Sequence, residues 1–364
     1  PVADPGPSLY SGTQGQPITF SGIGSTSVCG FPTLRWDFSD GGVAWGALPQ
    51  HTFQGSGLFS GLLTATDDTG LTNTKTFAID VADAAPIANA GPATSAAWGR
   101  PVQFNGSATD GAADLATLSY SWSFGDGSAA ASGASVVHSY AAPGVYTATL
   151  TVKDQHGMTG TDTRVVTVNE RGVTSAFLGD DGIFDTAGTL RASFTDQFGN
   201  PVPGRTVQFT VDGGSVGSAQ TNASGVATIA WTPAVDAGSH NVSAAFAGDN
   251  LYAASTANGS VTVDKKATSV SYTGALNGGP NKTVTLSAVL KDATGKALAG
   301  RTITFKLGTQ TASAVTDATG VAKASLQLNQ KNGSYSLTAT FAPTGADGPH
   351  YTGNAAAATF NLKK

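Results

Sequence analysis

Residues 120–157 read YSWSFGDGSAAASGASVVHSYAAPGVYTATLTVKDQHG, and this stretch decides the fold. In residues 146–152, apolar side chains alternate with threonines, a period of two that is typical of a half-buried β-strand. Trp122 and Phe124 are two residues apart and are therefore expected on one face of an earlier strand. Residues 125–127, Gly-Asp-Gly, favour a tight turn because glycine tolerates positive φ and aspartate bonds its own backbone. The stretch predicts β-strands joined by tight turns.

This stretch resembles the PKD (polycystic kidney disease) domain, a small Ig-like β-sandwich common in secreted and cell-surface proteins. The residues that carry the resemblance are Trp122-Ser-Phe-Gly-Asp-Gly127, His138-Ser-Tyr140, Pro143-Gly-Val-Tyr146 and Leu150-Thr-Val-Lys-Asp154. A degenerate copy precedes it, with Trp36-Asp-Phe-Ser-Asp-Gly41 and His51-Thr-Phe53 at an offset of 86 to 87 residues. A constant offset of this size indicates a tandem repeat.

The second half of the chain contains a different repeat, offset by 95 to 96 residues. Asp196–Phe209 (DQFGNPVPGRTVQF) parallels Asp292–Phe305 (DATGKALAGRTITF), and TNASGVA at 221–227 parallels TDATGVA at 316–322. Glycine or proline interrupts each module roughly every 8 to 12 residues, a spacing typical of a β-sandwich. By alternation, Val207, Phe209 and Val211 are expected on one face of a strand, and so are Ile303, Phe305 and Leu307. Both modules resemble the bacterial Ig-like repeats found along surface adhesins and secreted enzymes.

The composition favours an all-β chain. Charged residues make up 12% of the sequence and the only glutamate is Glu170, whereas Thr and Val, which favour strands, are abundant. We predict four tandem Ig-like or PKD-like β-sandwiches in an extended rod. Their expected bounds are 1–83 and 84–170 for the PKD-like pair, and 171–264 and 265–364 for the bacterial Ig-like pair.

Several classes of protein are disfavoured by the sequence. The single cysteine, Cys29, has no partner for an intramolecular disulfide. No run approaches the roughly 18 apolar residues of a membrane-spanning helix. The start at Pro1 suggests a processed or truncated product. One Glu, one Cys and turn-associated polar residues offer little from which to build a catalytic site, so no enzyme activity is expected.

The PKD resemblance raises the question of calcium, because some PKD-like domains bind this ion near the end of the sandwich. The candidate oxygen ligands fall into two groups, Asn105, Asp126 and Asp154, and then Asp180, Asp181 and Asp185. The alternative interpretation is turn chemistry, since aspartate beside glycine is what a tight turn requires. No other cofactor is expected.

Two tryptophans and two histidines are further candidates. Trp45 and Trp98 lie outside the repeated core motifs and could stack on sugar rings, or could simply pack between neighbouring loops. His51 and His138 occupy equivalent positions in the first repeat. A catalytic base is conceivable there, but packing beside Phe53 or Tyr140 at a sheet margin is the simpler interpretation.

Charge is unevenly distributed along the chain. The first three modules carry net charges of −5, −3 and −5, whereas the fourth, with 11 basic and 3 acidic residues, carries +8. A basic end could dock on an anionic envelope or polysaccharide, could pair with the acidic modules of another copy, or could only aid solubility. Nucleic acid is disfavoured, because the basic module has few aromatic residues and no recognised motif.

These observations favour a non-catalytic extracellular or cell-surface protein, a multi-domain spacer with structural and adhesive roles. Its expected partners are further copies of itself or envelope polysaccharide or protein. A filament or surface-layer subunit is one variant, motivated by the acidic-to-basic gradient. The alternative, from the PKD resemblance, is the accessory portion of a secreted polymer-degrading hydrolase whose catalytic domain lies elsewhere.

Overall fold

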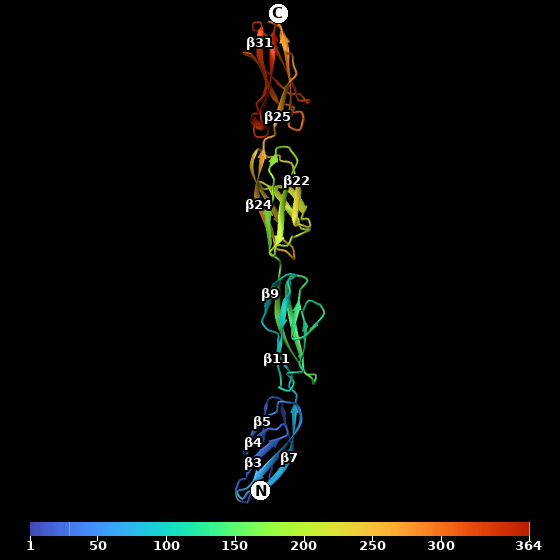
Figure 1. Cartoon of the computed structure of the whole chain (residues 1–364), viewed down its shortest axis with the longest axis vertical. Helices are drawn as coiled ribbons and strands as arrows, with labels where there is room; N and C mark the ends of the chain where they lie inside the picture. The colour runs from blue at the N-terminus through green and yellow to red at the C-terminus, as the bar shows by residue number, and fades with distance from the viewer. Residues whose placement is uncertain (29, 364) are drawn as a thin grey trace. The chain divides into compact units, whose positions relative to one another are not determined.

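The structure is a computed structural model that describes residues 1–364 except Cys29 and Lys364, so the cysteine lies outside the described residues. It divides into two compact units, Pro1–Arg171 and Gly172–Lys364. Each unit contains two β-sandwiches, numbered 1 to 4 along the chain (Figure 1). The all-β, tandem-sandwich fold is therefore confirmed.

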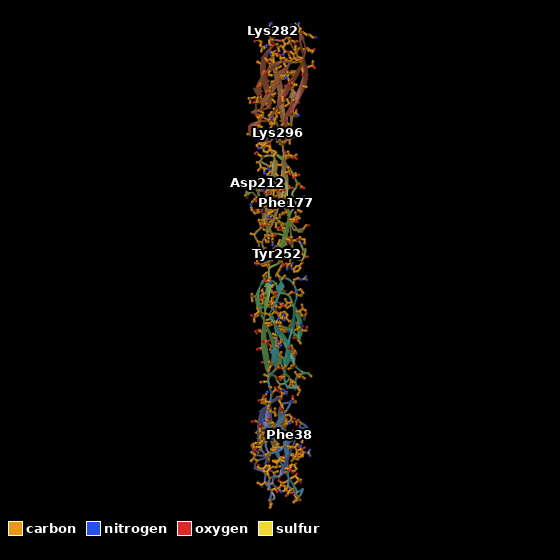
Figure 2. All side chains as sticks on the ribbon, turned by 90° about the vertical axis from the view of Figure 1, so that its left-hand side faces the viewer. Phe38, Phe177, Asp212, Tyr252, Lys282 and Lys296 are labelled. Carbon is orange, nitrogen blue, oxygen red and sulfur yellow. The ribbon has the colours of Figure 1, made fainter. Side chains whose placement is uncertain are left out.

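Sandwich 1 packs a five-stranded sheet of order β1-β7-β6-β3-β4 against the pair β2-β5. Trp36, Phe20 and Leu63 are fully buried in its core, and Phe38, labelled in Figure 2, is 5% exposed. The strands are β1 (Leu9–Thr13), β2 (Pro17–Thr19), β3 (Thr33–Phe38), β4 (Val43–Trp45), β5 (Gln50–Thr52), β6 (Gly57–Thr66) and β7 (Thr72–Ala82).

Sandwich 2 has the same plan, with a five-stranded sheet of order β13-β12-β15-β16-β9 and the pairs β10-β14 and β8-β11. Its strands are β8 (Ile87–Asn89), β9 (Thr94–Ala97), β10 (Val102–Asn105), β11 (Ser107–Thr109), β12 (Ser119–Ser123), β13 (Ala131–Ser132), β14 (Ser135–His138), β15 (Gly144–Lys153) and β16 (Thr159–Asn169).

The strand that the alternation in residues 146–152 predicts is β15. Ala148, Leu150 and Val152 are fully buried, while the intervening Thr149 and Thr151 are only half-buried. Sheets with one packed face show this period of two, because successive side chains point to opposite faces. The apolar face of β15 lies in one core with Trp122, so the sequence places this strand correctly.

Sandwich 3 combines the sheets β17-β19-β22 and β18-β24-β23-β20-β21. Val207, Phe209 and Val211 on β20 are all buried, as the alternation predicts. The strands are β17 (Val173–Phe177), β18 (Gly182–Ile183), β19 (Gly188–Asp196), β20 (Thr206–Val211), β21 (Gly214–Gln220), β22 (Val226–Trp231), β23 (Gly238–Phe246) and β24 (Ser255–Asp264).

Sandwich 4 repeats this topology, with the sheets β25-β27-β30 and β26-β32-β31-β28-β29. The extended loop before Tyr351 contains a short 3-10 helix, Gly345–Asp347. Within the described residues, no helix is long and apolar enough to cross a membrane. The strands are β25 (Thr268–Tyr272), β26 (Asn277–Gly278), β27 (Thr283–Asp292), β28 (Thr302–Leu307), β29 (Gln310–Val315), β30 (Val321–Gln327), β31 (Gly333–Phe341) and β32 (Asn354–Leu362).

Every sandwich closes its larger sheet by pairing an early strand in parallel with its last strand. The pairs are β1 with β7, β9 with β16, β18 with β24, and β26 with β32. The remaining strand pairs are antiparallel hairpin or Greek-key neighbours, as in Ig-like sandwiches.

Candidate functional site at the joint of sandwiches 1 and 2

Four aspartates from three separate loops gather where the linker from sandwich 1 enters sandwich 2. Asp83 follows β7 in the linker to β8, Asp110 and Asp114 lie between β11 and β12, and Asp154 begins the β15–β16 turn. The charges of Asp83, Asp114 and Asp154 all act on Asp110, which places the four carboxylates within electrostatic reach of one another. We call these four residues the joint cluster.

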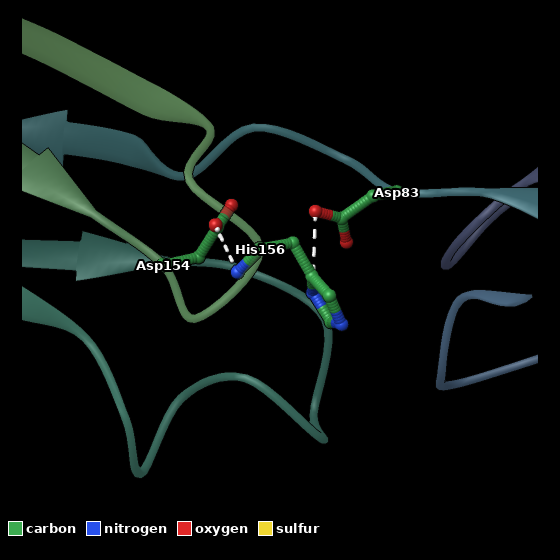
Figure 3. Close-up of side chains that lie close together, drawn as sticks. All are labelled: Asp83, Asp154 and His156. Atoms are coloured by element: carbon green, nitrogen blue, oxygen red, sulfur yellow. Dashed lines mark hydrogen bonds and ion pairs between the residues drawn. The ribbon is translucent and has the colours of Figure 1, made fainter.

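His156 lies at the edge of the joint cluster (Figure 3). Its Nδ1 is 3.3 Å from Asp83 Oδ2 and 3.6 Å from Asp114 Oδ1. Asp83, Asp154 and His156 each offer one candidate ligand atom, and these three atoms lie within 4.8 Å of one another. The imidazole is 46% exposed, whereas the Asp114 side chain is 1% exposed, so the histidine borders a carboxylate group that is otherwise largely buried.

Asp154 uses one carboxylate oxygen to build its own turn. Oδ1 accepts hydrogen bonds from the backbone N–H groups of His156 and Met158, both at 2.9 Å. An aspartate that bonds its following backbone in this way stabilises a tight turn. The residue is only 5% exposed, and its Oδ2 is buried without a hydrogen-bond partner. One oxygen of Asp154 is therefore available for another ligand.

Asp114 is held by two side-chain amides rather than by a cationic side chain. Gln14, from sandwich 1, donates to Oδ2 at 2.7 Å, and Gln155 donates to Oδ1 at 2.6 Å. The same Gln14 amide donates to the Gln54 carbonyl at 2.8 Å. Sandwich 1 thus reaches directly into the joint cluster through a side chain that is 3% exposed.

The joint cluster contains an unusual number of unsatisfied oxygens. Both oxygens of Asp83, Oδ2 of Asp110 and Oδ2 of Asp154 are buried without a hydrogen bond. Burial, followed by the charges of Asp114, Asp154 and Asp83, raises the pKa of Asp110. Within the described part of the chain, no Lys or Arg forms an ion pair with any of the four. A divalent cation would satisfy these groups.

The two groups of sequence-predicted metal ligands lie elsewhere, apart from Asp154. Because Ser119 pairs with Lys153 and Ser123 with Thr149, Asp126 lies at the opposite end of β15 from Asp154. Asp126 Oδ2 is 2.7 Å from His138 Nε2. Burial would raise the pKa of Asp126, but hydrogen bonds from Ser128 and His138 outweigh it and lower that pKa to about 2.

The remaining predicted ligands each have partners within the protein. Asn105 Oδ1 accepts a hydrogen bond from Ser135 Oγ at 2.8 Å. Asp180 pairs with Arg191 at 3.2 Å, Asp181 Oδ1 accepts the backbone N–H of Thr262, and Asp185 pairs with Lys266 and Lys296. The structure therefore gives these side chains roles in turns and ion pairs, and calcium binding there stays a prediction.

The two tryptophans outside the core motifs differ in exposure. Trp98 is half-buried, donates from Nε1 to the Ala141 carbonyl at 2.6 Å, and packs beneath the guanidinium of Arg171. Trp45, on edge strand β4, is 61% exposed and lies 5.7 Å from the guanidinium of Arg35. Local packing thus accounts for Trp98, whereas Trp45 keeps an accessible ring face. Sugar stacking remains a prediction for both.

Sequence reasoning missed three of the four members of the joint cluster. Asp83, Asp110 and Asp114 come from a linker and a long loop, where no periodicity predicts which side chains meet. The available signal was limited to two aspartates four residues apart, Asp110 and Asp114, and one aspartate in the linker, Asp83. Only the folded chain brings them to Asp154.

Comparison with known proteins agrees with the fold. Residues 1–81 and 83–168 match the PKD domain, and residues 179–264 match the bacterial Ig-like domain, group 3. Among solved structures, a Ca²⁺-stabilized, ice-binding adhesin from an Antarctic bacterium is 16% identical, covering 98% of this chain and 96% of its own, with a TM-score of 0.27.

Two further solved structures are also similar. A 1.5-MDa bacterial ice-binding adhesin is 15% identical over 77% of this chain and 99% of its own, with a TM-score of 0.26. An I-band fragment of titin is 11% identical over 78% of this chain and 100% of its own, with a TM-score of 0.34. On these matches, the chain contains two PKD domains in tandem, within residues 1–168, followed by a bacterial Ig-like domain at residues 179–264.

Proposed function

We propose that this chain is a non-catalytic, adhesive spacer of the cell surface, whose sandwiches hold a binding surface at a set distance from its anchor. PKD and bacterial Ig-like domains in series support this function, because each is a self-contained sandwich that adds length without adding a reaction centre. A spacer must also limit movement at its joints, and the joint of sandwiches 3 and 4 carries the observation on which the proposal rests.

The joint of sandwiches 3 and 4 buries a charged side chain. Lys266, in the linker, is 3% exposed, and its Nζ lies 3.0 Å from Asp292 Oδ2 in sandwich 4. The same ammonium donates to the Asp185 carbonyl of sandwich 3 at 2.8 Å. The ring of Phe184 stacks on His350 with centroids 3.9 Å apart. A freely moving linker could not keep a lysine buried, so these contacts support a fixed spacing.

The adhesive role would reside in sandwich 4. Its net charge of +8 contrasts with the acidic modules before it, and its cations reach from Lys282 near one end to Lys296 near the other (Figure 2). Lys291 and Lys323 are exposed on the sheet β25-β27-β30. A positively charged surface attracts anionic polymers, so an acidic envelope polysaccharide is the partner that fits best.

Surface location tests the spacer function directly. Antibodies against the purified chain are expected to label intact cells of the source organism, and brief protease treatment of intact cells should remove the signal. Cells that lack the gene provide the control. Labelling that appears only after lysis would contradict the proposal.

Binding to an acidic polysaccharide tests the adhesive part. The chain should be retained on an immobilised uronic-acid polymer at low salt and released by roughly 0.5 M NaCl, because salt screens exposed charges. The variant Lys291→Glu/Lys323→Glu should bind several-fold more weakly, while Arg35→Glu on sandwich 1 should not differ from the wild type. Equal retention of all three proteins, or self-association at low salt without polymer binding, would contradict this assignment.

A further inference from the structure

The loop between β22 and β23, residues 232–237, touches sandwich 4 through contacts that do not involve the linker. The backbone N–H of Ala237 donates to the Pro349 carbonyl at 3.1 Å. The Asp236 Oδ1 lies 3.0 Å from His350 Nε2 in sandwich 4. We call residues 232–237 the contact loop. The joint of sandwiches 3 and 4 thus has two attachments, the linker with its buried Lys266 and the contact loop.

His240, on β23, holds the contact loop from within sandwich 3. Its Nε2 lies 2.6 Å from the Asp236 carbonyl oxygen, and its Nδ1 lies 2.6 Å from Oδ2 of Asp212, which Figure 2 labels. Asp212 is itself fixed, because its Oδ1 accepts the Asn241 backbone N–H at 2.8 Å. The His240 side chain is 12% exposed. This imidazole therefore joins the β20–β21 turn to the contact loop.

Both partners of His240 are hydrogen-bond acceptors. A neutral imidazole has one N–H donor and one bare nitrogen, so it can make only one of these two bonds, whereas an imidazolium donates from both nitrogens. The hydrogen bond to the Asp212 carboxylate raises the pKa of His240 against the opposing effect of burial, and the Asp236 carbonyl adds to the increase. The observed geometry is therefore that of the charged histidine.

The other charged groups at this joint keep their charge while His240 titrates. Within the described residues, the lysines and the arginine near the joint are paired with carboxylates: Lys266 with Asp292, Lys296 with Asp185, and Arg301 with Asp347. Such groups titrate well below or well above the range of histidine.

His350 differs from His240 in the number of its acceptors. It faces the single acceptor Asp236 and stacks on Phe184 with ring centroids 3.9 Å apart. A neutral imidazole with its proton on Nε2 can keep that one bond. The charge state of His240 is therefore what decides how the contact loop is held.

We propose that protonated His240 fastens the contact loop and thereby fixes sandwich 4 against sandwich 3, and that loss of this proton to solvent leaves the linker as a hinge. Since the folded pKa of His240 lies above its ordinary value near 6.5, these bonds are fully present below about pH 6.5. They are lost as pH rises through the folded pKa. The inference concerns the joint alone and stands whether or not the protein is located at the cell surface.

A distance measurement across the joint tests the proposal on the full chain. Spin labels on Ser218→Cys of β21 and Ser313→Cys of β29, both at exposed positions, would report the separation of the two sandwiches in a Cys29→Ser background. Pulsed electron paramagnetic resonance should give a narrow distance distribution at about pH 6 and one broader by roughly half or more at about pH 9.

Two glutamine variants distinguish the histidines. Glutamine has no titratable group in this range and cannot reproduce the two fixed bonds of the His240 imidazolium, so His240→Gln should give the broad distribution at both pH values. His350→Gln can still donate to its single acceptor and should keep the pH dependence. His156→Gln makes the same change in sandwich 2 and is the control, which should behave as the wild type does.

Three results would overturn the proposal. These are equal widths at both pH values in the wild type, pH-dependent broadening that persists in His240→Gln, or its loss in His350→Gln, which would assign the effect to the other histidine. Imidazole ¹⁵N resonances of the wild type provide a measurement that needs no variant at this site. At about pH 6.5 an ordinary histidine is half protonated, whereas His240 should be mainly imidazolium. Half protonation or less would contradict the assignment.

Discussion

Histidine–aspartate pairs recur at equivalent positions of sandwiches 1 and 2. His51 lies 2.7 Å from Asp40 and stacks on Phe38, with ring centroids 4.3 Å apart. His138 lies 2.7 Å from Asp126 and stacks on Phe124 at 3.9 Å. Each imidazole also meets the edge of the aromatic ring two residues later. The pairs therefore pack at the core margin, in line with the simpler interpretation of their sequence.

The Asp126 carboxylate is expected to stabilise sandwich 2 in a pH-dependent way. Its folded pKa is lowered to about 2, so its contribution is present above the unfolded value near 4 and is lost as pH falls from about 4 to about 2. Asp126→Asn should cost about 1 kcal/mol of unfolding free energy at pH 7, allowing for solvent screening, and almost nothing near pH 2. Urea unfolding across this range measures the difference.

The exposed Asp68 supplies the control for that experiment. Asp68→Asn makes the same chemical change on an open surface and should shift the unfolding free energy by less than about 0.5 kcal/mol at either pH. A cost at Asp126 that is the same at pH 7 and pH 2 would contradict the assigned role of its charge.

Replacing the buried Lys266 is expected to lower the free energy of unfolding far more than replacing its exposed neighbour Lys296. Burial would raise the pKa of Asp292, but hydrogen bonds from Thr294 and Lys266 outweigh it and lower that pKa to about 2. Lys266→Met leaves this carboxylate charged and unpaired, which should cost about 3 kcal/mol in denaturant unfolding.

Lys296 forms an ion pair at 3.2 Å with Asp185, which also lies within ion-pair distance of Lys266, but the Lys296 side chain is 66% exposed. Lys296→Met should therefore cost less than about 1 kcal/mol. Equal costs for the two lysine variants would show that burial of the Lys266 pair is not what stabilises this joint.

At the scale of single elements, strands and turns were the most predictable features. Alternation correctly identified the buried faces of β15, β20 and β28 because each strand packs one face on a core. Glycine-containing motifs located turns, since Gly125 and Gly127 have φ of +79° and +80°. The joint cluster was not predictable, because loops from distant parts of the chain meet there without a shared period.

The sequence TDATGVA at residues 316–322 contains a turn glycine, Gly320, whose replacement by alanine gives a testable prediction. Gly320 has φ of +80°, and a Cβ there would collide with the Leu290 carbonyl oxygen. Gly320→Ala should destabilise sandwich 4 by about 3 kcal/mol, because backbone strain and the collision add. Thermal or urea unfolding of the full chain measures it.

Gly295 offers a matched comparison within the same sandwich. Its φ is +85°, but a Cβ there would have open space around it. Gly295→Ala should therefore cost only about 1 kcal/mol, the strain of the left-handed conformation alone. Similar costs at both glycines would mean that the close approach to Leu290 relaxes freely.

At the scale of the whole molecule, buried side chains gather into a separate core for each sandwich rather than into a common one. Trp36 anchors sandwich 1, Trp122 sandwich 2, Phe209 sandwich 3 and Phe305 sandwich 4, and all four are fully buried. Repeat proteins built in this way are stabilised by individual modules plus the interfaces between neighbours. The joints are therefore expected to contribute more to the stability of the chain than their small number of residues suggests.

The parallel closure of each sandwich determines how the chain would respond to tension. In sandwich 1 the entering strand β1 pairs in parallel with the departing strand β7, from Leu9 beside Ala78 to Thr13 beside Ala82. A pull on the two chain ends slides these strands in opposite directions, so the whole ladder is sheared at once instead of being unzipped bond by bond. Single-molecule stretching should then give abrupt rupture events, each releasing roughly 3.5 Å per residue of freed chain. Smooth lengthening at low load would contradict this expectation.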